Sequence, residues 1–285
     1  YPSKSDRIRL SALADFHWWN RNCAVEKLRA DIAAIAADTH WFATGIGDYG
    51  DFITWSDKRF DAEAISPEVT VRDLSQIGHA LSEQIKELLW PIRGKLLGLG
   101  KGNHEKKYEV LREQSEMHSA LCYALGVPNF GYSTIYDIVF RRTSEVDKPT
   151  LTRQVCKKSG CDKWAIRVFQ HHGAGAAQTH GGKMNRLTRF MNQHEADLYL
   201  IAHLHDETMK KLIRIGANRD CTEPVQKVTL GTITGTYLRT YEKGVTGYGE
   251  IRGYDPTPLG AVVVEFEPFK RKMRLMLEAE VRNDA

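Results

Sequence analysis

The stretch RIRLSALADFH, from Arg7 to His17, decides the fold. Residues 7–14 alternate polar and apolar side chains, and the pattern stops at Asp15, as in a strand that runs to the edge of a sheet. Residues at i and i+2 of an extended segment point to the same face, so Asp15 and His17 can bind one cation together. An Asp-x-His triplet also arises by chance, so its weight depends on the residues at the ends of the other strands.

The second predicted strand, residues 41–46, ends in a segment with two carboxylates. It is followed by Gly47-Asp48-Tyr49-Gly50-Asp51. Gly47 lets the backbone approach a site closely, and Asp48 is placed to bridge two cations. For Asp51, a carboxylate that forms a turn or orients a ligand is favoured over a direct ligand.

The third predicted strand, residues 95–99, is followed shortly by Gly102-Asn103-His104-Glu105. The Asn103 oxygen is a suitable neutral ligand, and His104 beside it can act as an acid or a base. Glu105 either orients His104 or is an ordinary solvated carboxylate. On its own the segment would be read as a helix N-cap asparagine with a surface histidine.

Two further strand ends carry histidines. His171 and His172 follow strand 164–170, and only one of them can face a given ion because neighbours on a strand point to opposite faces. His203 and His205 follow strand 198–201, where i and i+2 spacing places both imidazoles on one face. Burying so many carboxylates and imidazoles without a cation would be costly, which favours a metal site.

Hydrophobic periodicity predicts an α/β fold in one domain over residues 1–285. Strands and helices alternate in the first half, and the second half is richer in strands, so we expect sheets inside and helices outside. Residues 142–163 are polar and predict an excursion from the core. The predicted helices are 22–39, 73–89, 108–125 and 183–193, and the remaining predicted strands are 132–140, 209–215, 225–233, 260–267 and 273–277.

Composition excludes several classes of protein. The chain has 42% hydrophobic and 27% charged residues, as a globular protein does, and its longest apolar stretches are far too short to span a membrane. A net charge of +4 is compatible with an anionic substrate, but it is too small to argue for nucleic acid. Five scattered cysteines predict a reducing compartment, and Cys156 and Cys161 are expected to be ordinary thiols.

The ordered set Asp-x-His, Gly-Asp-x-x-Asp, Gly-Asn-His-Glu, His and x-His-x-His resembles the calcineurin-like metallophosphoesterases of phages and bacteria. The resemblance spans residues 15–205 and implies a four-layer α/β/β/α sandwich in the cytoplasm, or the host cytoplasm for a phage protein. One implied metal site consists of Asp15, His17, Asp48 and His205. The other consists of Asp48, Asn103, His171 and His203, with Asp48 as the bridge.

The fourth ligand is the open point in this set. His171 is preferred because the family's ligand usually lies two residues before a Gly or Pro, here Gly173, and His172 is the alternative. Ala202 departs from the family's glycine, and its methyl group is tolerable unless the backbone there needs a glycine-only conformation.

The resemblance implies hydrolysis of a phosphoester by a hydroxide that bridges two divalent ions, with His104 as the catalytic acid. Mixed nitrogen and oxygen ligands suit Mn, Fe, Zn, Co or Ni. The predicted substrate is a nucleotide or nucleic acid, which makes the chain a phosphodiesterase or nuclease. Residues 235–258 are rich in Gly, Tyr and Arg, and we expect substrate contacts from Arg239, Tyr241 and Arg252.

Two other functions remain open. A phosphomonoesterase, including a protein phosphatase, would not need the tyrosine- and arginine-rich segment. A non-catalytic metal-binding scaffold is the least favoured, because the chain keeps Asn103 and His104. The sequence leaves the oligomeric state and the identity of the metal open.

Overall fold

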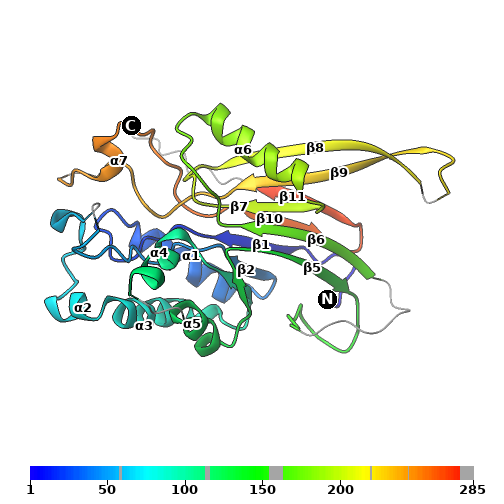
Figure 1. Cartoon of the computed structure of the whole chain (residues 1–285). Helices are drawn as coiled ribbons and strands as arrows, with labels where there is room; N and C mark the ends of the chain where they lie inside the picture. The colour runs from blue at the N-terminus through cyan, green and yellow to red at the C-terminus, as the bar shows by residue number, and fades with distance from the viewer. Residues whose placement is uncertain (58–59, 113–115, 154–162, 219, 243, 277–285) are drawn as a thin grey trace, which may run out of the picture.

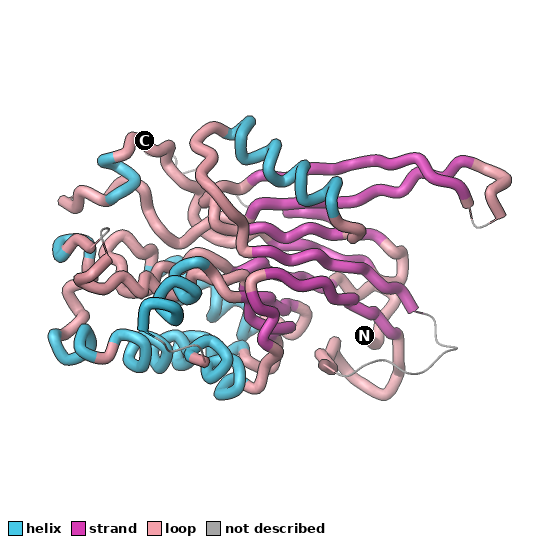
Figure 2. Tube along the Cα trace, in the orientation of Figure 1, coloured by secondary structure: helices cyan, strands magenta, loops and turns pink. Residues whose placement is uncertain are grey.

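The computed structural model describes residues 1–57, 60–112, 116–153, 163–218, 220–242 and 244–276 (Figures 1 and 2). Within them the chain forms two sheets, and the predicted mixed α/β class is confirmed. The first sheet has the order β11 (Lys272–Met276), β10 (Val263–Glu267), β1 (Ile8–Leu13), β2 (Trp41–Gly45), β3 (Leu96–Gly100) and β4 (Asn129–Gly131). The second has the order β5 (Ser133–Arg141), β6 (Lys163–His171), β7 (Leu198–Ile201), β9 (Pro224–Ile233) and β8 (Thr208–Ala217).

The central strands of both sheets are parallel, and this is what gathers the site. β1, β2, β3 and β4 run in one direction, and β10 pairs antiparallel to β1. In the second sheet β6, β7 and β9 are parallel, with antiparallel β5 and β8 at the edges. The carboxyl ends of parallel strands meet at one edge, where α/β sheets place their ligands.

An apolar cluster lies between the two sheets. Leu10, Phe42 and Phe266 from the first sheet pack with Val168 and Leu198 from the second. These side chains alternate with residues on the other face of their strands, as pleated strands require. The cluster holds the two sheets, and so their carboxyl ends, against each other.

Helices cover the outer faces. α1 (Val25–Ala37), α3 (Ile77–Leu89) and α5 (Met117–Leu125) form one apolar cluster with the first sheet, and α6 (His180–Gln193) packs on the second (Figure 1). Each helix buries one stripe at helical spacing, such as Leu81, Ile85 and Leu89 in α3. The other α-helices of the described residues are α2 (Val71–Ser75), α4 (Asn103–Arg112) and α7 (Tyr248–Ile251).

Several boundaries differ from the predicted ones. Helix 73–89 is divided into α2 and α3 at Gln76, and a capping box between Thr70 and Asp73 starts α2. Helix 108–125 is instead α4 and α5, and α4 begins at Asn103, inside the third motif. α5 ends at Gly126 in the left-handed conformation, as its sequence predicts. Short β4 was not predicted.

Other predictions concern the periphery. Residues 142–153, in the predicted excursion, form no strand, and residues 154–162, with Cys156 and Cys161, lie outside the described residues. Cys23, Cys122 and Cys221 are free thiols. None of the described helices has the length and apolarity needed to cross a bilayer.

Candidate metal centre

The ends of β1 and β7 place one group of ligand atoms together. Asp15, His17 and His205 each offer an atom within 4.8 Å of the others. His17 Nε2 lies 3.2 Å from His205 Nε2, and that atom lies 3.5 Å from Asp15 Oδ1. Asp15 Oδ2 accepts the backbone N–H of His203 at 2.9 Å, whereas the buried Oδ1 has no hydrogen-bond partner among the described residues. A buried carboxylate oxygen without a partner is costly, and a cation would satisfy it.

The ends of β2, β6 and β7 form a second group. Asp48, His172 and His203 again offer atoms within 4.8 Å of one another. His172 Nε2 lies 3.1 Å from Asp48 Oδ2 and 3.0 Å from Asn103 Oδ1. Four side chains that converge in this way are an arrangement able to hold a divalent ion with nitrogen and oxygen ligands.

His172, and not His171, lies in this group. His171 Nδ1 accepts the backbone N–H of Gly173 at 2.7 Å, and its ring packs against Phe190 of α6 with centroids 4.7 Å apart. The physical reason is strand alternation: His171 shares the α6 face of β6, while His172 continues toward the inter-sheet face. His172 therefore replaces His171 in the candidate ligand set.

Two of the imidazoles are oriented through their second nitrogen. His17 Nδ1 lies 3.2 Å from Asp51 Oδ1, and His172 Nδ1 lies 3.0 Å from the carbonyl oxygen of Ile46. An oxygen acceptor fixes a proton on Nδ1, so in the neutral form of each ring the Nε2 lone pair is directed into the cluster. Asp51 is thus in contact with His17, and its carboxylate also lies within 4.8 Å of ring nitrogens of His17 and His104, so these three side chains form a third group able to hold an ion.

The charges of the cluster favour a positive charge at its centre. Burial lowers the pKa of His172, but the carboxylates of Asp48 and Asp15 outweigh burial and raise this pKa to about 9. Burial, assisted by the charge of His172, lowers the pKa of His203 to about 4. His203 is therefore neutral near pH 7, the form in which an imidazole binds a metal.

His104 lies next to both groups. Its backbone N–H donates to Asp48 Oδ1 at 2.9 Å, and its Nδ1 donates to the carbonyl oxygen of Asp51. The ring meets His17 edge to face, with centroids 4.8 Å apart. Nε2 is therefore the atom with which His104 can exchange a proton with a bound ligand.

Glu105 does not orient His104. Its buried carboxylate accepts the backbone N–H groups of Tyr49 at 2.7 Å and of Asp48 and Gly102 at 3.0 Å. It thereby joins the second and third motifs through their backbones. A Cβ at position 102 would lie 2.0 Å from Asp48 Oδ1, so glycine is required there for this close approach.

The backbone at the strand ends is unusual. Asp15, His17, Asp48, His203 and His205 all have positive φ, between 46° and 73°. This left-handed conformation is rare for residues other than glycine and persists where the surroundings over-determine it, often at functional sites. The positions of Asp15, His17, His203 and His205 are therefore set by turns after the strands and not by strand alternation, and His203 and His205 belong to different groups. Ala202 does not have positive φ, so its methyl group is accommodated.

A cleft of about 850 Å³ opens at the cluster. His17, Asp48 and Asn103 line it, together with Arg239 and Arg252 from the predicted substrate segment. Tyr241, the third predicted substrate contact, does not line it, because its hydroxyl donates to the carbonyl oxygen of Tyr254 at 2.9 Å. The segment therefore contributes its arginines to the cleft wall.

The sequence did not predict several residues that line the cleft. Trp19, Asn20 and Asn22 line the cleft beside His17, and Asn20 Nδ2 donates to Asp51 Oδ2 at 3.1 Å. They follow the first motif directly, which is the only signal in the sequence that would have marked them. Lys101 and Lys107, which flank the third motif, form ion pairs with Glu109 and Asp57, each at 2.6 Å.

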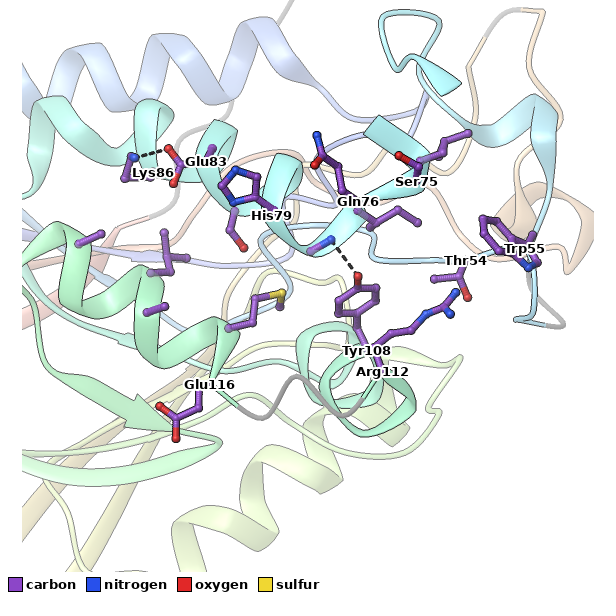
Figure 3. Close-up of a pocket in the computed structure, with 18 residues that line it drawn as sticks. Thr54, Trp55, Ser75, Gln76, His79, Glu83, Lys86, Tyr108, Arg112 and Glu116 are labelled. Atoms are coloured by element: carbon purple, nitrogen blue, oxygen red, sulfur yellow. Dashed lines mark hydrogen bonds and ion pairs between the residues drawn. The ribbon is translucent and has the colours of Figure 1, made fainter. Parts of the chain in front are cut away.

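A second cavity, of about 900 Å³, lies apart from the ligand groups (Figure 3). It is a groove of the helical layer between α3 and the α4–α5 region. His79, Glu83, Tyr108 and Arg112 line it, and Tyr108 accepts the backbone N–H of Gly78 at 2.9 Å. None of the predicted site residues lines this groove, so the chemistry belongs to the first cleft.

No protein-family model and no curated protein matches the chain. One similar solved structure is a conserved uncharacterized protein from Streptococcus pneumoniae, described as a predicted phosphoesterase. It is 10% identical, covers 95% of this chain and 98% of its own, and gives a TM-score of 0.33. A likeness this low does not assign the chain to a family.

Proposed function

We propose that the chain is a hydrolase of phosphoesters that depends on two divalent metal ions, in a single four-layer α/β/β/α domain of the calcineurin-like metallophosphoesterase type. The observation that carries the proposal is the convergence of seven side chains from five separate strand ends, five of which line one cleft while Asp15 and His172 lie buried behind it. They are Asp15, His17, Asp48, Asn103, His172, His203 and His205.

The donor set fits such ions. One ion would be held by Asp15, His17 and His205. The other would be held by Asn103, His172 and His203, and Asp48 would bridge the two ions. The unpartnered Asp15 Oδ1 and the facing nitrogens of His17 and His205 support this assignment. Bound ions of this kind supply Lewis-acid polarisation of the phosphoester and a water of lowered pKa, and Mn, Fe, Zn, Co or Ni suits the ligands.

The protein's own groups supply the remaining chemistry. With both ring nitrogens protonated, His104 would give the Nε2 proton to the leaving oxygen and keep the Nδ1 proton in its hydrogen bond to the Asp51 carbonyl. Asp51 keeps the His17 lone pair directed at its ion. Glu105 fixes the backbone of Asp48, so the proposed bridge does not have to be ordered during the reaction.

The substrate we propose is a phosphodiester of the nucleotide or nucleic-acid class. Support comes from the size of the cleft and from Arg239 and Arg252 in its wall, which suit an anionic substrate larger than phosphate alone. A phosphomonoesterase, including a protein phosphatase, is the alternative. A metal-binding scaffold is disfavoured because Asn103 and His104 both line the cleft.

The test is hydrolysis of mono- and bis-p-nitrophenyl phosphate by the purified protein with Mn²⁺ and with each of the other candidate metals. We expect the bis ester to be the better substrate. Asp48→Asn and His104→Ala should each lower kcat/KM by about 100-fold or more. His79→Ala, which removes an exposed imidazole from the groove of Figure 3, is the matched control and should retain activity.

Each outcome has a distinct meaning. If the wild type hydrolyses neither ester with any candidate metal, the enzyme proposal fails. If Asp48→Asn equals the wild type, the ligand assignment fails. A preference for the mono ester would favour the phosphomonoesterase alternative.

A further inference from the structure

The cleft continues beyond the ligand groups, along a wall made by residues 19–22 and the segment after Leu238. Trp19 and Asn22 line this part with Arg239 and Tyr254. The two walls are tied together, because the backbone N–H of Arg239 donates to the carbonyl oxygen of Asn22 at 2.9 Å, and Cys23 forms a β-bridge to Leu238. This part of the cleft is therefore a built surface next to the metal centre.

Asn22 has an unsatisfied polar group in this wall. The residue is only 4% exposed, and its Oδ1 has no hydrogen-bond partner among the described residues. Its backbone N–H donates to Asn20 Oδ1 at 3.0 Å, so the residue is held firmly. A Cβ at position 247 would lie 2.3 Å from Asn22 Nδ2, so glycine at 247 lets that segment pack against the amide nitrogen.

A buried acceptor without a donor costs roughly 1–3 kcal/mol, unless a ligand supplies the donor. Phosphate oxygens at neutral pH accept hydrogen bonds, so the phosphate of a substrate cannot satisfy this oxygen. An N–H group can. A carboxamide that turns about its Cβ–Cγ bond presents an acceptor beside a donor, the pattern that matches the edge of a nucleobase.

Trp19 is half-buried, packs against the apolar core and contributes an aromatic ring to the same wall of the cleft. Its φ is 77°, a genuine outlier for a bulky residue. Its indole Nε1 donates to Gln84 Oε1 at 2.8 Å, which fixes the orientation of the ring. Unstacked bases are commonly recognised by an aromatic ring together with hydrogen bonds to a base edge.

We propose that Trp19 and Asn22 form a nucleobase subsite, in which the base stacks on the indole and donates an N–H to Asn22 Oδ1. This inference rests on the proposed function, because the phosphate of the same molecule would lie at the ligand groups. The cleft volume of about 850 Å³ falls in the range of small-molecule sites and accommodates a nucleotide unit.

The test is calorimetric titration of Mn²⁺-loaded protein with adenosine, guanosine, cytidine and uridine 5′-monophosphates and with ribose 5-phosphate, which lacks a base. We expect at least one nucleotide to bind about tenfold more tightly than ribose 5-phosphate. Asn22→Leu should weaken that nucleotide about tenfold and leave ribose 5-phosphate unchanged. Asn185→Leu, the same change at an exposed position of α6, should alter neither affinity.

Two results would overturn the subsite. One is that no nucleotide binds more tightly than ribose 5-phosphate, and the other is that Asn22→Leu weakens both ligands equally, which would indicate a structural role. Hydrolysis of the bis ester is measured on the same preparations. If the protein hydrolyses the bis ester but binds nucleotides no more tightly than ribose 5-phosphate, the subsite alone is refuted. If it binds a nucleotide more tightly but shows no metal-dependent hydrolysis, the proposed function alone is refuted.

Discussion

The strand-end ligand groups and segment 235–258 form walls of one cleft, but they are built differently. Each ligand follows a buried parallel strand, so the sheet ladders fix its position to within a turn. The described residues of segment 235–258, all but 243, form only the helix Tyr248–Ile251 and isolated bridges. Side-chain contacts such as Thr257 Oγ1 to the Leu238 carbonyl hold the segment. The contrast indicates that the sheets position the reactive groups, whereas the loop determines which substrate fits the cleft.

The largest expected effect separates two adjacent histidines at the end of β6. His172→Leu should lower kcat/KM on the bis ester by at least about 100-fold, because removing a mere orienting partner of a metal ligand already costs about 10- to 100-fold. His171→Leu should stay within about threefold and lose only about 1 kcal/mol of stability with its hydrogen bond to Gly173 N–H. Activity assays and thermal unfolding check both. Equal activity losses in the pair would contradict the assignment of His172.

This pair shows where sequence reasoning reaches its limit. The motif and its place after a strand are visible in the sequence, but the face of β6 that meets the other sheet is not. Val168 packs between the sheets and Phe169 packs under α6, and both are large and apolar. Their side chains therefore do not reveal which face of β6 points to the other sheet. Only the packed structure distinguishes His171 from His172.

A smaller effect is expected at Asp51, which orients a ligand without joining the set. Asp51→Asn keeps an oxygen that can accept from His17 Nδ1 but loses the negative charge. We expect the Mn²⁺ concentration for half-maximal activity to rise about 10-fold. Titration of activity with Mn²⁺ measures it, and Asp197→Asn serves as the control, because Asp197 precedes β7 at the end opposite to the ligands. An unchanged Mn²⁺ requirement would show that the contact is incidental.

Substitutions in segment 235–258 should have a smaller effect, and they should change KM rather than kcat. Arg239→Ala or Arg252→Ala should raise KM for the bis ester about fivefold and leave kcat within about twofold, because partly exposed cations contribute modestly to binding. Tyr241→Phe should leave KM unchanged, since the Tyr241 hydroxyl bonds to the Tyr254 carbonyl. Steady-state kinetics decides this, and a fall in kcat in either arginine variant would place that arginine in the chemistry.

The same contrast governs how much could be predicted. The two sheets, most strands and the groups at their ends follow from apolar runs that stop at polar motifs, because strand ends must converge in a parallel sheet. The cleft wall could not be predicted, since Trp19 and Asn22 derive their positions from contacts with Gln84, Arg239 and Gly247, which are distant in sequence. The left-handed turns at Asp15 and His203 likewise leave no pattern in the sequence.

The smallest expected effect lies behind the ligand loops, at His118. The residue is 1% exposed, its Nε2 donates to the Leu99 carbonyl at 3.2 Å, and burial lowers its pKa from 6.5 to about 4. Between those pH values the unfolded chain binds a proton at this residue and the folded chain does not, so stability falls as the pH drops from 6.5 toward 4. His118→Leu should reduce this acid loss by a few degrees in Tm, since 1 kcal/mol corresponds to about 2–4 °C. Thermal unfolding in the presence of EDTA at several pH values measures it, with His79→Leu as the exposed control. An acid loss as steep as that of the wild type would show that His118 is already protonated in the folded core, and that the core behind the ligand loops tolerates charge.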